Sequence, residues 1–468
     1  MLFSSLTFLF AFLPILGILY MIIKNRKLRN IILLIFSLIF YAWGEPKYIF
    51  IMLGTTLVSY ICGIIINIFD EKKQYKFKKI SFVFSLILLL GNLFIFKYYN
   101  FTVNSINSIF HLSINNILLD LPIGISFYTF QIISYIVDLY KGKVKVQKNI
   151  ISLALYISLF PQLIAGPIVR YETVCNELDN RKETLKDCSY GLKRFIIGLS
   201  KKVLISNQMA VIADYVFDKG ILGTSIVWIA ALAYTFQIYF DFSGYSDMAI
   251  GLGKMFGFNF LENFNYPYIA TSITDFWRRW HISLSTWFRD YVYIPLGGNR
   301  VSKLRWMFNI LIVWALTGLW HGANWNFIIW GTYFGVILLL EKLVLNKILK
   351  KCPKFISWIY SIILIIIGWV IFRSETLQQI STLLSNMFCY TKTDWIYVIS
   401  NNTKILFCLI FFIPAIIFST PILKILKEKF KSKNIIVIIG NLCLIVLFAL
   451  CIVFLNSSNY NPFIYFRF

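Results

Sequence analysis

The sequence predicts an all-α polytopic membrane protein, and three observations lead to that prediction. Of its 468 residues, 59% are hydrophobic and only 14% are charged, and the mean hydropathy of +0.73 lies far from the balance of globular proteins. Apolar runs of roughly 17 to 25 residues, the length that crosses a bilayer, recur along the chain. Lysines and arginines gather in the short segments between these runs, as in the loops of multi-pass membrane proteins.

The apolar runs follow one another from the first residues to the last. They lie at 2–23, 30–44, 47–69, 80–98, 116–140, 195–217, 222–250, 306–341, 355–373, 404–423 and 434–455. The run at 306–341 is interrupted by Gly322-Ala323-Asn324 and is interpreted as two helices, so about eleven or twelve spans are expected. The apolar stretch 149–168 contains Pro161 and Pro167, which favours a re-entrant hairpin surrounded by protein.

The formal net charge of +24 would suit a nucleic-acid-binding protein, but the positions of the basic residues disfavour that class. They form clusters at 24–29, 72–79 and 141–148, each between two apolar runs. Under the positive-inside rule these loops are cytoplasmic and both termini lie outside. The loop 100–116 carries no lysine or arginine and is expected to be external. The eight cysteines show no short Cys-x-x-Cys spacing, so no metal site is expected.

The segment from Asp275 to Arg300, DFWRRWHISLSTWFRDYVYIPLGGNR, is too polar for an ordinary span and too aromatic for an ordinary loop. A re-entrant or interfacial position lining a cavity fits this composition best. Arg278, Arg279 and Arg289 are candidates for an anion site, because the guanidinium fork pairs bidentately with phosphate. The alternative is that these arginines anchor the segment to lipid headgroups.

A histidine inside the membrane, His321, is the strongest candidate for chemistry. The fifteen residues from Trp306 to Trp320 rise about 22 Å as a helix, which places His321 well inside the membrane at the tip of a helical hairpin. Its near-neutral pKa suits it to act as a general base on a hydroxyl, and Gly318 and Gly322 would allow a close approach by another chain or a substrate. The alternative is a structural histidine of the protein core.

The remaining polar candidates favour plainer interpretations. His111, the third histidine, lies in the expected external loop and is interpreted as a surface residue. Asp241 and Asp247, in YFDFSGYSD, need partners within a membrane segment. They either line a path for the acceptor or form structural ion pairs, and the structural interpretation is preferred.

Several long motifs together resemble the membrane-bound O-acyltransferase family in its bacterial, alginate O-acetylase-like branch. WRRWHISLSTWFRDYVYIPLGGNR at 277–300 and LTGLWHGANWNFIIWG at 316–331 look like its signature. LPIGISFYTFQIISYIVDLY, SLFPQLIAGPIVRY and FDFSGYSDMAIGLGKMFGF, at 121–140, 158–171 and 240–258, resemble the same branch. The ending FIYFRF is also similar, although glutamine is expected where Arg467 stands.

The resemblance implies a single integral-membrane domain over 1–468, with N-terminal helices at 1–98, a catalytic core at about 121–341 and C-terminal helices at 355–468. It implies a ring of helices with an outer funnel and a cytoplasmic tunnel for the acyl donor. His321 matches the family's catalytic histidine and His281 its second motif position. The expectation is that acetyl-CoA, which is a donor substrate and not a permanently bound cofactor, docks from the cytoplasm with its phosphates on the arginines. His321 would then activate a hydroxyl while His281 orients or polarises the thioester carbonyl.

The resemblance also implies a partner and a setting in the cell. Members of this branch bring acetyl groups across the bacterial cytoplasmic (inner) membrane, and a separate extracytoplasmic SGNH-type protein places them on a polysaccharide or cell-wall glycan. The expected function is therefore O-acetylation of a polymer of the alginate, cellulose or peptidoglycan type. D-alanyl transfer to teichoic acid, a polysaccharide transporter and a non-catalytic membrane scaffold stay open as alternatives.

Overall fold

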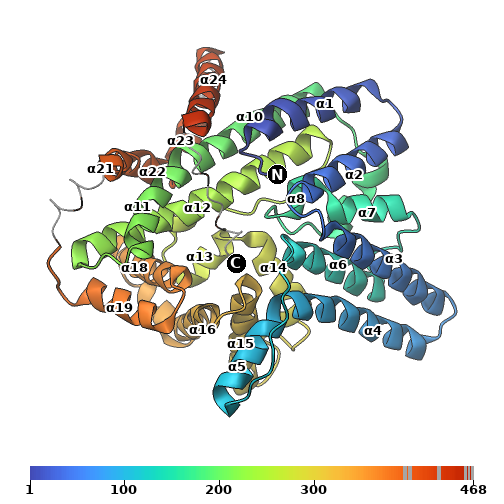
Figure 1. The fold of residues 1–468 in the computed structure, drawn as a ribbon, viewed down its shortest axis with the longest axis horizontal. Helices are drawn as coiled ribbons and strands as arrows, with labels where there is room; N and C mark the ends of the chain where they lie inside the picture. The colour runs from blue at the N-terminus through green and yellow to red at the C-terminus, as the bar shows by residue number, and fades with distance from the viewer. Residues whose placement is uncertain (394–397, 399–402, 430–433, 458–460, 462–463, 465–468) are drawn as a thin grey trace. The chain divides into compact units, whose positions relative to one another are not determined.

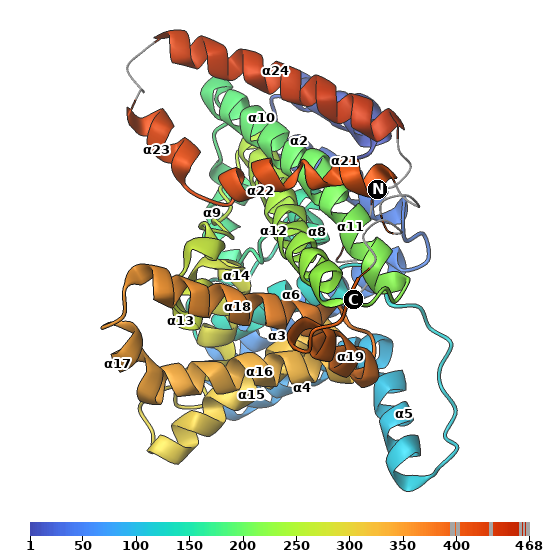
Figure 2. The same cartoon turned by 90° about the vertical axis from the view of Figure 1, so that its left-hand side faces the viewer.

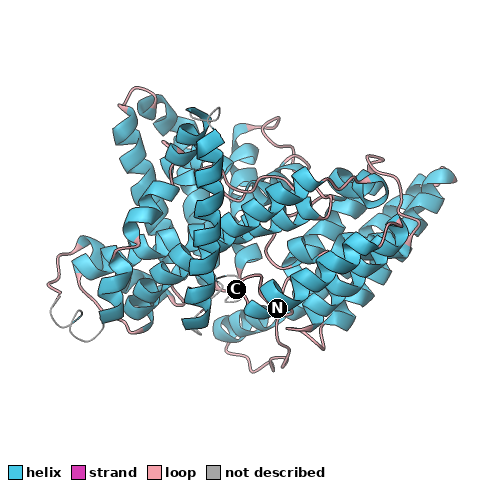
Figure 3. Cartoon of the chain, turned by 90° about the horizontal axis from the view of Figure 1, so that it is seen from above, coloured by secondary structure: helices cyan, strands magenta, loops and turns pink. Residues whose placement is uncertain are grey.

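A computed structural model describes the chain except for residues 394–397, 399–402, 430–433, 458–460, 462–463 and 465–468. Within the described ranges the regular structure is helical, and no strand is drawn (Figure 3). The chain forms two compact units, one of residues 1–195 and 248–261 and the other of residues 196–247 and 262–468. The chain passes from one unit to the other within α10 (Leu185–Ser200), within α12 (Thr224–Met255) and again between residues 261 and 262.

The first unit contains the N-terminal helices. These are η1 (Phe8–Phe12), α1 (Leu13–Ile22), α2 (Arg26–Ala42), α3 (Ile49–Glu71), α4 (Tyr75–Leu93), η2 (Phe94–Tyr98), α5 (Tyr99–Phe110), α6 (Ile125–Tyr140), α7 (Ile150–Ser158), α8 (Phe160–Leu163), α9 (Tyr171–Asn180) and the first part of α10 (Leu185–Ser200). The long helices α3 and α4 lie side by side (Figure 1). Phe40 of α2 packs against Phe8 of η1 and Phe160 of α8 in the core of this unit, with ring centroids 6.0 and 5.7 Å apart.

The second unit contains the remaining helices. These are η3 (Lys201–Ser206), α11 (Asn207–Asp218), most of α12 (Thr224–Met255), η4 (Pro267–Ile269), α13 (Ile273–Arg279), α14 (Ile282–Phe288), η5 (Arg289–Tyr293), α15 (Lys303–His321), α16 (Trp325–Leu340), η6 (Glu341–Leu345), α17 (Asn346–Leu349), α18 (Lys354–Arg373), α19 (Leu377–Phe388), α21 (Thr403–Leu409), α22 (Phe412–Phe418), α23 (Ile422–Lys429) and α24 (Asn434–Ser457). Helix α16 lies between α15 and α18 (Figure 2).

The helices confirm a multi-pass membrane protein. Seven helical stretches in the described part of the chain are long and apolar enough to cross a membrane: Ile49–Glu71, Tyr75–Phe110, Leu185–Asp218, Thr224–Met255, Trp325–Leu349, Lys354–Arg373 and Ile436–Ser457. Phe8–Ile22 and Thr403–Phe418 are shorter apolar helices. The break at Gly322-Ala323-Asn324 separates α15 from α16 as expected.

Of three local expectations about helix limits and breaks, the structure differs from two and agrees with one. The run 116–140 becomes helical only at Ile125, because Gly124 adopts a left-handed conformation with φ of +77° and Pro122 precedes it. The expected external loop 100–116 is instead helical up to Phe110, since α5 continues α4 through the π-helical turn η2. The stretch 149–168 is broken at Leu159 and almost wholly buried, which agrees with a helical segment enclosed by protein.

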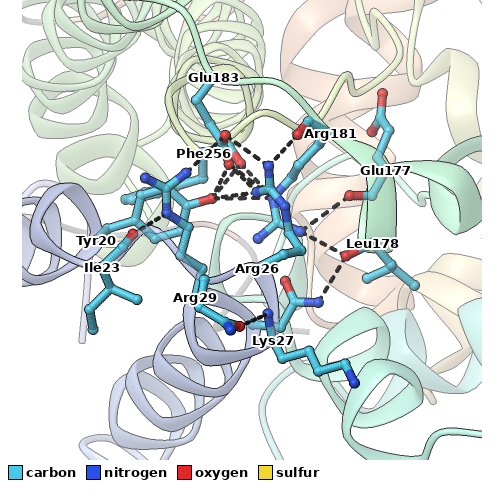
Figure 4. Close-up of polar contacts among 12 residues, drawn as sticks. Tyr20, Ile23, Arg26, Lys27, Arg29, Glu177, Leu178, Arg181, Glu183 and Phe256 are labelled. Carbon is cyan, nitrogen blue, oxygen red and sulfur yellow. Dashed lines mark hydrogen bonds and ion pairs between the residues drawn. The ribbon is translucent and has the colours of Figure 1, made fainter.

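A polar network holds together the loops at one end of the first unit (Figure 4). Glu183 accepts hydrogen bonds from Tyr20 and from Arg26, and Arg29 reaches the same carboxylate at 3.1 Å. The buried Arg181 donates from Nε to the carbonyl oxygen of Phe256 at 3.0 Å. Two arginines of the first basic cluster are therefore paired with a carboxylate, and the network joins α1, α2 and the loop before α10.

Candidate active site

His321 is the last residue of α15, at the tip of the α15–α16 hairpin in the second unit. Only 7% of the residue is exposed. Its ring lies edge-on to three aromatic rings, those of Trp320, Trp330 and Phe372, at centroid distances of 5.0, 5.0 and 5.2 Å. Asn324 caps the next helix by accepting from the backbone N–H of Trp325. The hairpin thus presents His321 within an aromatic cage.

The glycines beside His321 serve the hairpin itself. A Cβ atom on Gly318 would lie 2.1 Å from the carbonyl oxygen of Phe327, and one on Gly322 would lie 2.2 Å from the Phe327 ring. A Cβ on Gly331 of α16 would likewise lie 2.2 Å from the carbonyl oxygen of Trp314. The close approach that the glycines allow is therefore that of helix α16, and not of a substrate or another chain.

His281 joins the two short helices α13 and α14. These have seven residues each, too short to cross a bilayer, as expected for a re-entrant or interfacial segment. His281 is 1% exposed and has a left-handed backbone with φ of +45°. Few residues other than glycine adopt that conformation, and functional sites are where it concentrates. Its ring packs edge-on against Phe242 and Trp320 at 4.6 and 5.8 Å.

Asn263 decides which nitrogen of His281 carries the proton. The Asn263 Oδ1 atom lies 3.1 Å from the backbone nitrogen of Ser283 and 3.2 Å from His281 Nδ1. A backbone N–H only donates, so the atom that faces it is the amide oxygen and not the amide nitrogen. His281 Nδ1 must therefore donate to Asn263. In the neutral ring, Nε2 then carries a lone pair, and this atom has no partner among the described residues.

The structure brings the two histidines together. Both rings contact Trp320, and burial, followed by the proximity of His321, lowers the pKa of His281 well below its usual value. His281 is therefore neutral at pH 7. An expected role in polarising a carbonyl would require an N–H at Nε2, whereas this tautomer offers a proton acceptor there.

A cavity opens beside His321 within the second unit. Its lining is apolar and aromatic apart from His321: Ile238, Phe242, Trp280, Trp330, Trp369, Phe372 and Ile464. The cavity is small, with a volume of about 10 Å³, and its wall offers dispersion contacts next to the imidazole and few polar partners for water.

The three expected arginines do not share one environment. Arg279 forms an ion pair with Asp275 at 3.0 Å, and Arg289, whose side chain is 59% exposed, pairs with the adjacent Asp290 at 2.6 Å. Arg278 is exposed and lies within electrostatic reach of Lys342. Two of the three arginines are thus already paired with carboxylates, and the surplus positive charge is at Arg278 and Lys342.

The other polar candidates have clear outcomes. Asp241 and Asp247 pair with Lys202 and Lys201, at 2.5 and 2.6 Å, so their partners are lysines and not arginines. His111 is exposed, as expected for a surface residue. No group of three or more potential metal ligands is found in the part of the chain that the structure describes.

Two residues that hold the site in place were not predicted from the sequence. Asn263 is one. The other is Glu341, fully buried, whose carboxylate accepts from the backbone nitrogens of Ile273 and Thr274 at the start of α13, at 2.6 and 2.8 Å. A lone carboxylate in the apolar run ILLLEKLV is a signal that could have drawn attention to Glu341. Asn263 carries no such signal.

The helices and their hydropathy define a multi-pass membrane protein, and its second unit holds two buried histidines, of which His321 lines an apolar cavity. The sequence model of the membrane-bound O-acyltransferase family matches residues 144–377. The chain belongs to this family and is an O-acyltransferase, which sets aside the transporter and scaffold alternatives.

Curated relatives agree with this assignment. The chain is 45% identical to a probable alginate O-acetylase of Pseudomonas syringae pv. tomato, over 84% of this chain and 76% of that protein. It is 36% identical to the peptidoglycan O-acetyltransferase of Helicobacter pylori, over 83% and 80% of the two chains. A teichoic acid D-alanyltransferase of Bacillus subtilis is 32% identical, over 46% of this chain and 58% of that protein.

Proposed function

We propose that this protein transfers acetyl groups from cytoplasmic acetyl-CoA towards the O-acetylation of an extracytoplasmic polysaccharide. The observation that carries the proposal is the buried His321 at an apolar cavity, with the buried His281 against the same Trp320 ring, in an O-acyltransferase. The names of its relatives support a glycan as the final acceptor, because alginate and peptidoglycan are both polysaccharide-based polymers.

In the proposed reaction, His321 is the general base. It takes the proton of an acceptor hydroxyl, whose oxygen attacks the thioester carbonyl carbon. An ester forms, the carbon–sulfur bond breaks, and the leaving thiolate takes the proton from the His321 imidazolium. His281 is proposed to present its Nε2 lone pair towards the acceptor and to position it by accepting a hydrogen bond from a second hydroxyl group, because the proton of the attacking hydroxyl goes to His321. The neutrality of His281 supports this role, since only the neutral ring has a lone pair there.

The donor is proposed to bind from the cytoplasm through its phosphates. Among the expected arginines, Arg278 is supported best, because it is exposed, lies within electrostatic reach of Lys342, and forms no ion pair within the described part of the chain. Arg279 and Arg289 would have to exchange their ion pairs with Asp275 and Asp290 for contacts with phosphate. The first contribution to donor affinity is therefore assigned to Arg278.

The proposed setting is the bacterial cytoplasmic membrane, with both termini outside, about eleven or twelve spans, an outer funnel and a cytoplasmic tunnel. The catalytic core is placed at about residues 121–341. The basic clusters between the N-terminal helices support this orientation. A separate SGNH-type protein on the outer side is proposed to complete transfer to the polymer. D-alanyl transfer to teichoic acid ranks second, because those relatives match about half of the chain.

The test is acyl transfer from radiolabelled acetyl-CoA by the purified protein in nanodiscs, with a simple hydroxyl compound as acceptor. We expect turnover by the wild type and by His111→Ala, which alters an exposed histidine, and a loss of at least about 100-fold in His321→Ala. Full activity in a correctly inserted His321→Ala protein would refute the mechanism. Turnover with a D-alanyl carrier-protein thioester and none with acetyl-CoA would favour the second candidate.

A matched pair of arginine variants tests the donor site. Arg278→Ala is expected to raise KM for acetyl-CoA by about tenfold, the effect of one phosphate contact of about 1.4 kcal/mol. Arg289→Ala is expected to have a smaller effect, because Arg289 is paired with its neighbour. Equal KM values in the wild type and Arg278→Ala would remove Arg278 from the donor site.

A further inference from the structure

Two residues of the C-terminal segment are fixed against the second unit. The backbone N–H of Ile464 donates to Asp241 Oδ2 at 2.8 Å, in a buried hydrogen bond. The side chain of Asn461 accepts from Asn207 Nδ2 at 3.1 Å. Asn461 is thus bonded to α11 and Ile464 to α12, and the attachment of Ile464 depends on a carboxylate.

That carboxylate belongs to a deeply buried ion pair. Lys202 Nζ lies 2.5 Å from Asp241 Oδ1, and the two side chains are 3% and 1% exposed. Burying both charges costs more than an exposed pair would return, so stability alone is a weak reason for such a pair. An ionised carboxylate is, however, a stronger and better-oriented hydrogen-bond acceptor than a neutral group. Here its second oxygen receives the Ile464 N–H.

The same helical turn of α12 also forms part of the cavity beside His321. Ile238 and Phe242, three residues before and one residue after Asp241, both line that cavity. The side chain of Ile464, which is 4% exposed, lines it too. Asp241 therefore fixes the backbone of Ile464 at the place where its side chain faces the cavity.

We propose that the Lys202–Asp241 pair is a positioning device that fixes the backbone of Ile464 so that its side chain forms one wall of the acyl cavity and limits the length of the acyl group. The inference rests on the proposed function, since it takes the cavity beside His321 as the acyl site. Ile464 determines specificity by occupying space, while Asp241 and Lys202 act through Ile464.

The first test is acyl-length selectivity in nanodiscs, with acetyl-CoA and propionyl-CoA compared in the same assay. Ile464→Ala removes three carbon atoms from the wall and is expected to raise the propionyl-to-acetyl ratio of kcat/KM by at least about tenfold, the usual effect of one methylene. Ile405→Ala is the control, because Ile405 is equally buried in the same unit but does not line the cavity. A ratio unchanged in Ile464→Ala, or changed equally in the control, would overturn the proposal.

The second test separates positioning from simple stability. Two double variants remove both charges: Lys202→Met with Asp241→Asn keeps an oxygen that accepts from Ile464, and Lys202→Met with Asp241→Leu has a similar shape but no acceptor. Hydrogen exchange of the C-terminal peptide is expected to be slow in the Asn variant and faster in the Leu variant. The propionyl-to-acetyl ratio should follow the same order. Equal exchange and equal ratios in two equally folded variants would refute the positioning role.

The two hypotheses fail in different ways. Loss of activity in His321→Ala with an unchanged acyl ratio in Ile464→Ala would leave the proposed function intact and overturn this inference. Full activity in His321→Ala would overturn the proposed role of His321, whatever the acyl ratio in Ile464→Ala. The exchange measurement does not depend on activity, so it tests the attachment of Ile464 by Asp241 in either case.

Discussion

Replacing Asn263 by aspartate puts a negative charge on the proton-bearing side of His281. The new carboxylate still accepts from the backbone nitrogen and hydroxyl of Ser283, which lie 3.1 and 2.9 Å from the present amide oxygen. The local fold is therefore kept, whereas the charge beside the imidazole changes. The variant therefore tests whether a neutral His281 is needed for turnover.

The size of the effect follows from the contact between the two side chains. Asn263 Oδ1 lies 3.2 Å from His281 Nδ1, and an opposite charge at this range raises the pKa of a histidine by about 1 to 3 units, or roughly 1.4 to 4 kcal/mol. In the wild type, burial and then His321 hold the pKa of His281 well below its usual value. If the neutral ring is the active form, activity falls as His281 becomes protonated. Because the pKa is higher in the variant, this loss should begin at a higher pH than in the wild type.

The assay is the pH dependence of kcat/KM for acetyl transfer in nanodiscs. We expect the acidic limb of the Asn263→Asp profile to lie about 1 to 3 pH units above that of the wild type. Asn265→Asp is the control, because Asn265 is exposed and its charge is screened by solvent. An acidic limb at the same pH in Asn263→Asp and the wild type, with both proteins folded, would refute the requirement for neutral His281.

Three further outcomes test how the rest of the fold is held. Glu183→Gln should cost about 2 to 4 kcal/mol of stability in thermal unfolding at pH 7. Although burial opposes its ionisation, hydrogen bonds from arginine and tyrosine hold the pKa of Glu183 below its usual value. The wild-type advantage should therefore be lost as the pH falls through this lowered pKa, and an advantage that persists in strong acid would contradict this account. Glu341→Gln replaces one acceptor oxygen by a donor beside the first turn of α13. It should lower kcat and reduce the free energy of unfolding by about 1 to 3 kcal/mol. A wild-type kcat in this variant would show that the contact does not position the site. Gly318→Ala should prevent α15 and α16 from packing closely and lower the yield of folded protein in size-exclusion chromatography. Gly440→Ala is the control, because the space around its Cβ position is open. Equal yields of the two variants would contradict the close approach of α16 to Gly318.

Hydropathy and charge sufficed to predict the fold class, because both follow directly from the bilayer as a solvent. Helix limits were predicted less well. The run 116–140 is apolar throughout, but hydropathy does not report the left-handed backbone at Gly124 that delays the helix to Ile125. The loop 100–116 lacks lysine and arginine, yet α5 continues as helix to Phe110, since a polar composition does not by itself end a helix.

The candidate site was predicted by residue type and not by partner. The sequence indicated His321 and His281, and the structure brings both to Trp320. The tautomer of His281 depends on Asn263, which is 18 residues away in the chain, and no spacing rule connects the two. The three arginines are close in sequence, but Asp275 and Asp290 pair with only two of them, Arg279 and Arg289. Composition alone could not show which of the three would be paired.

The surroundings of His321 give it two properties that an acyltransferase needs together. Three aromatic rings pack edge-on around the imidazole, and the cavity beside it is lined by apolar side chains, so water has few polar partners there. In the proposed reaction, a thioester bound beside His321 would be protected from hydrolysis, while His321 would act as the base for a hydroxyl that reaches it. Because Ile464 is part of the same wall, loss of its attachment to Asp241 would admit water as well as longer acyl groups. Thioester hydrolysis without an acceptor is therefore the side reaction that the C-terminal segment would suppress.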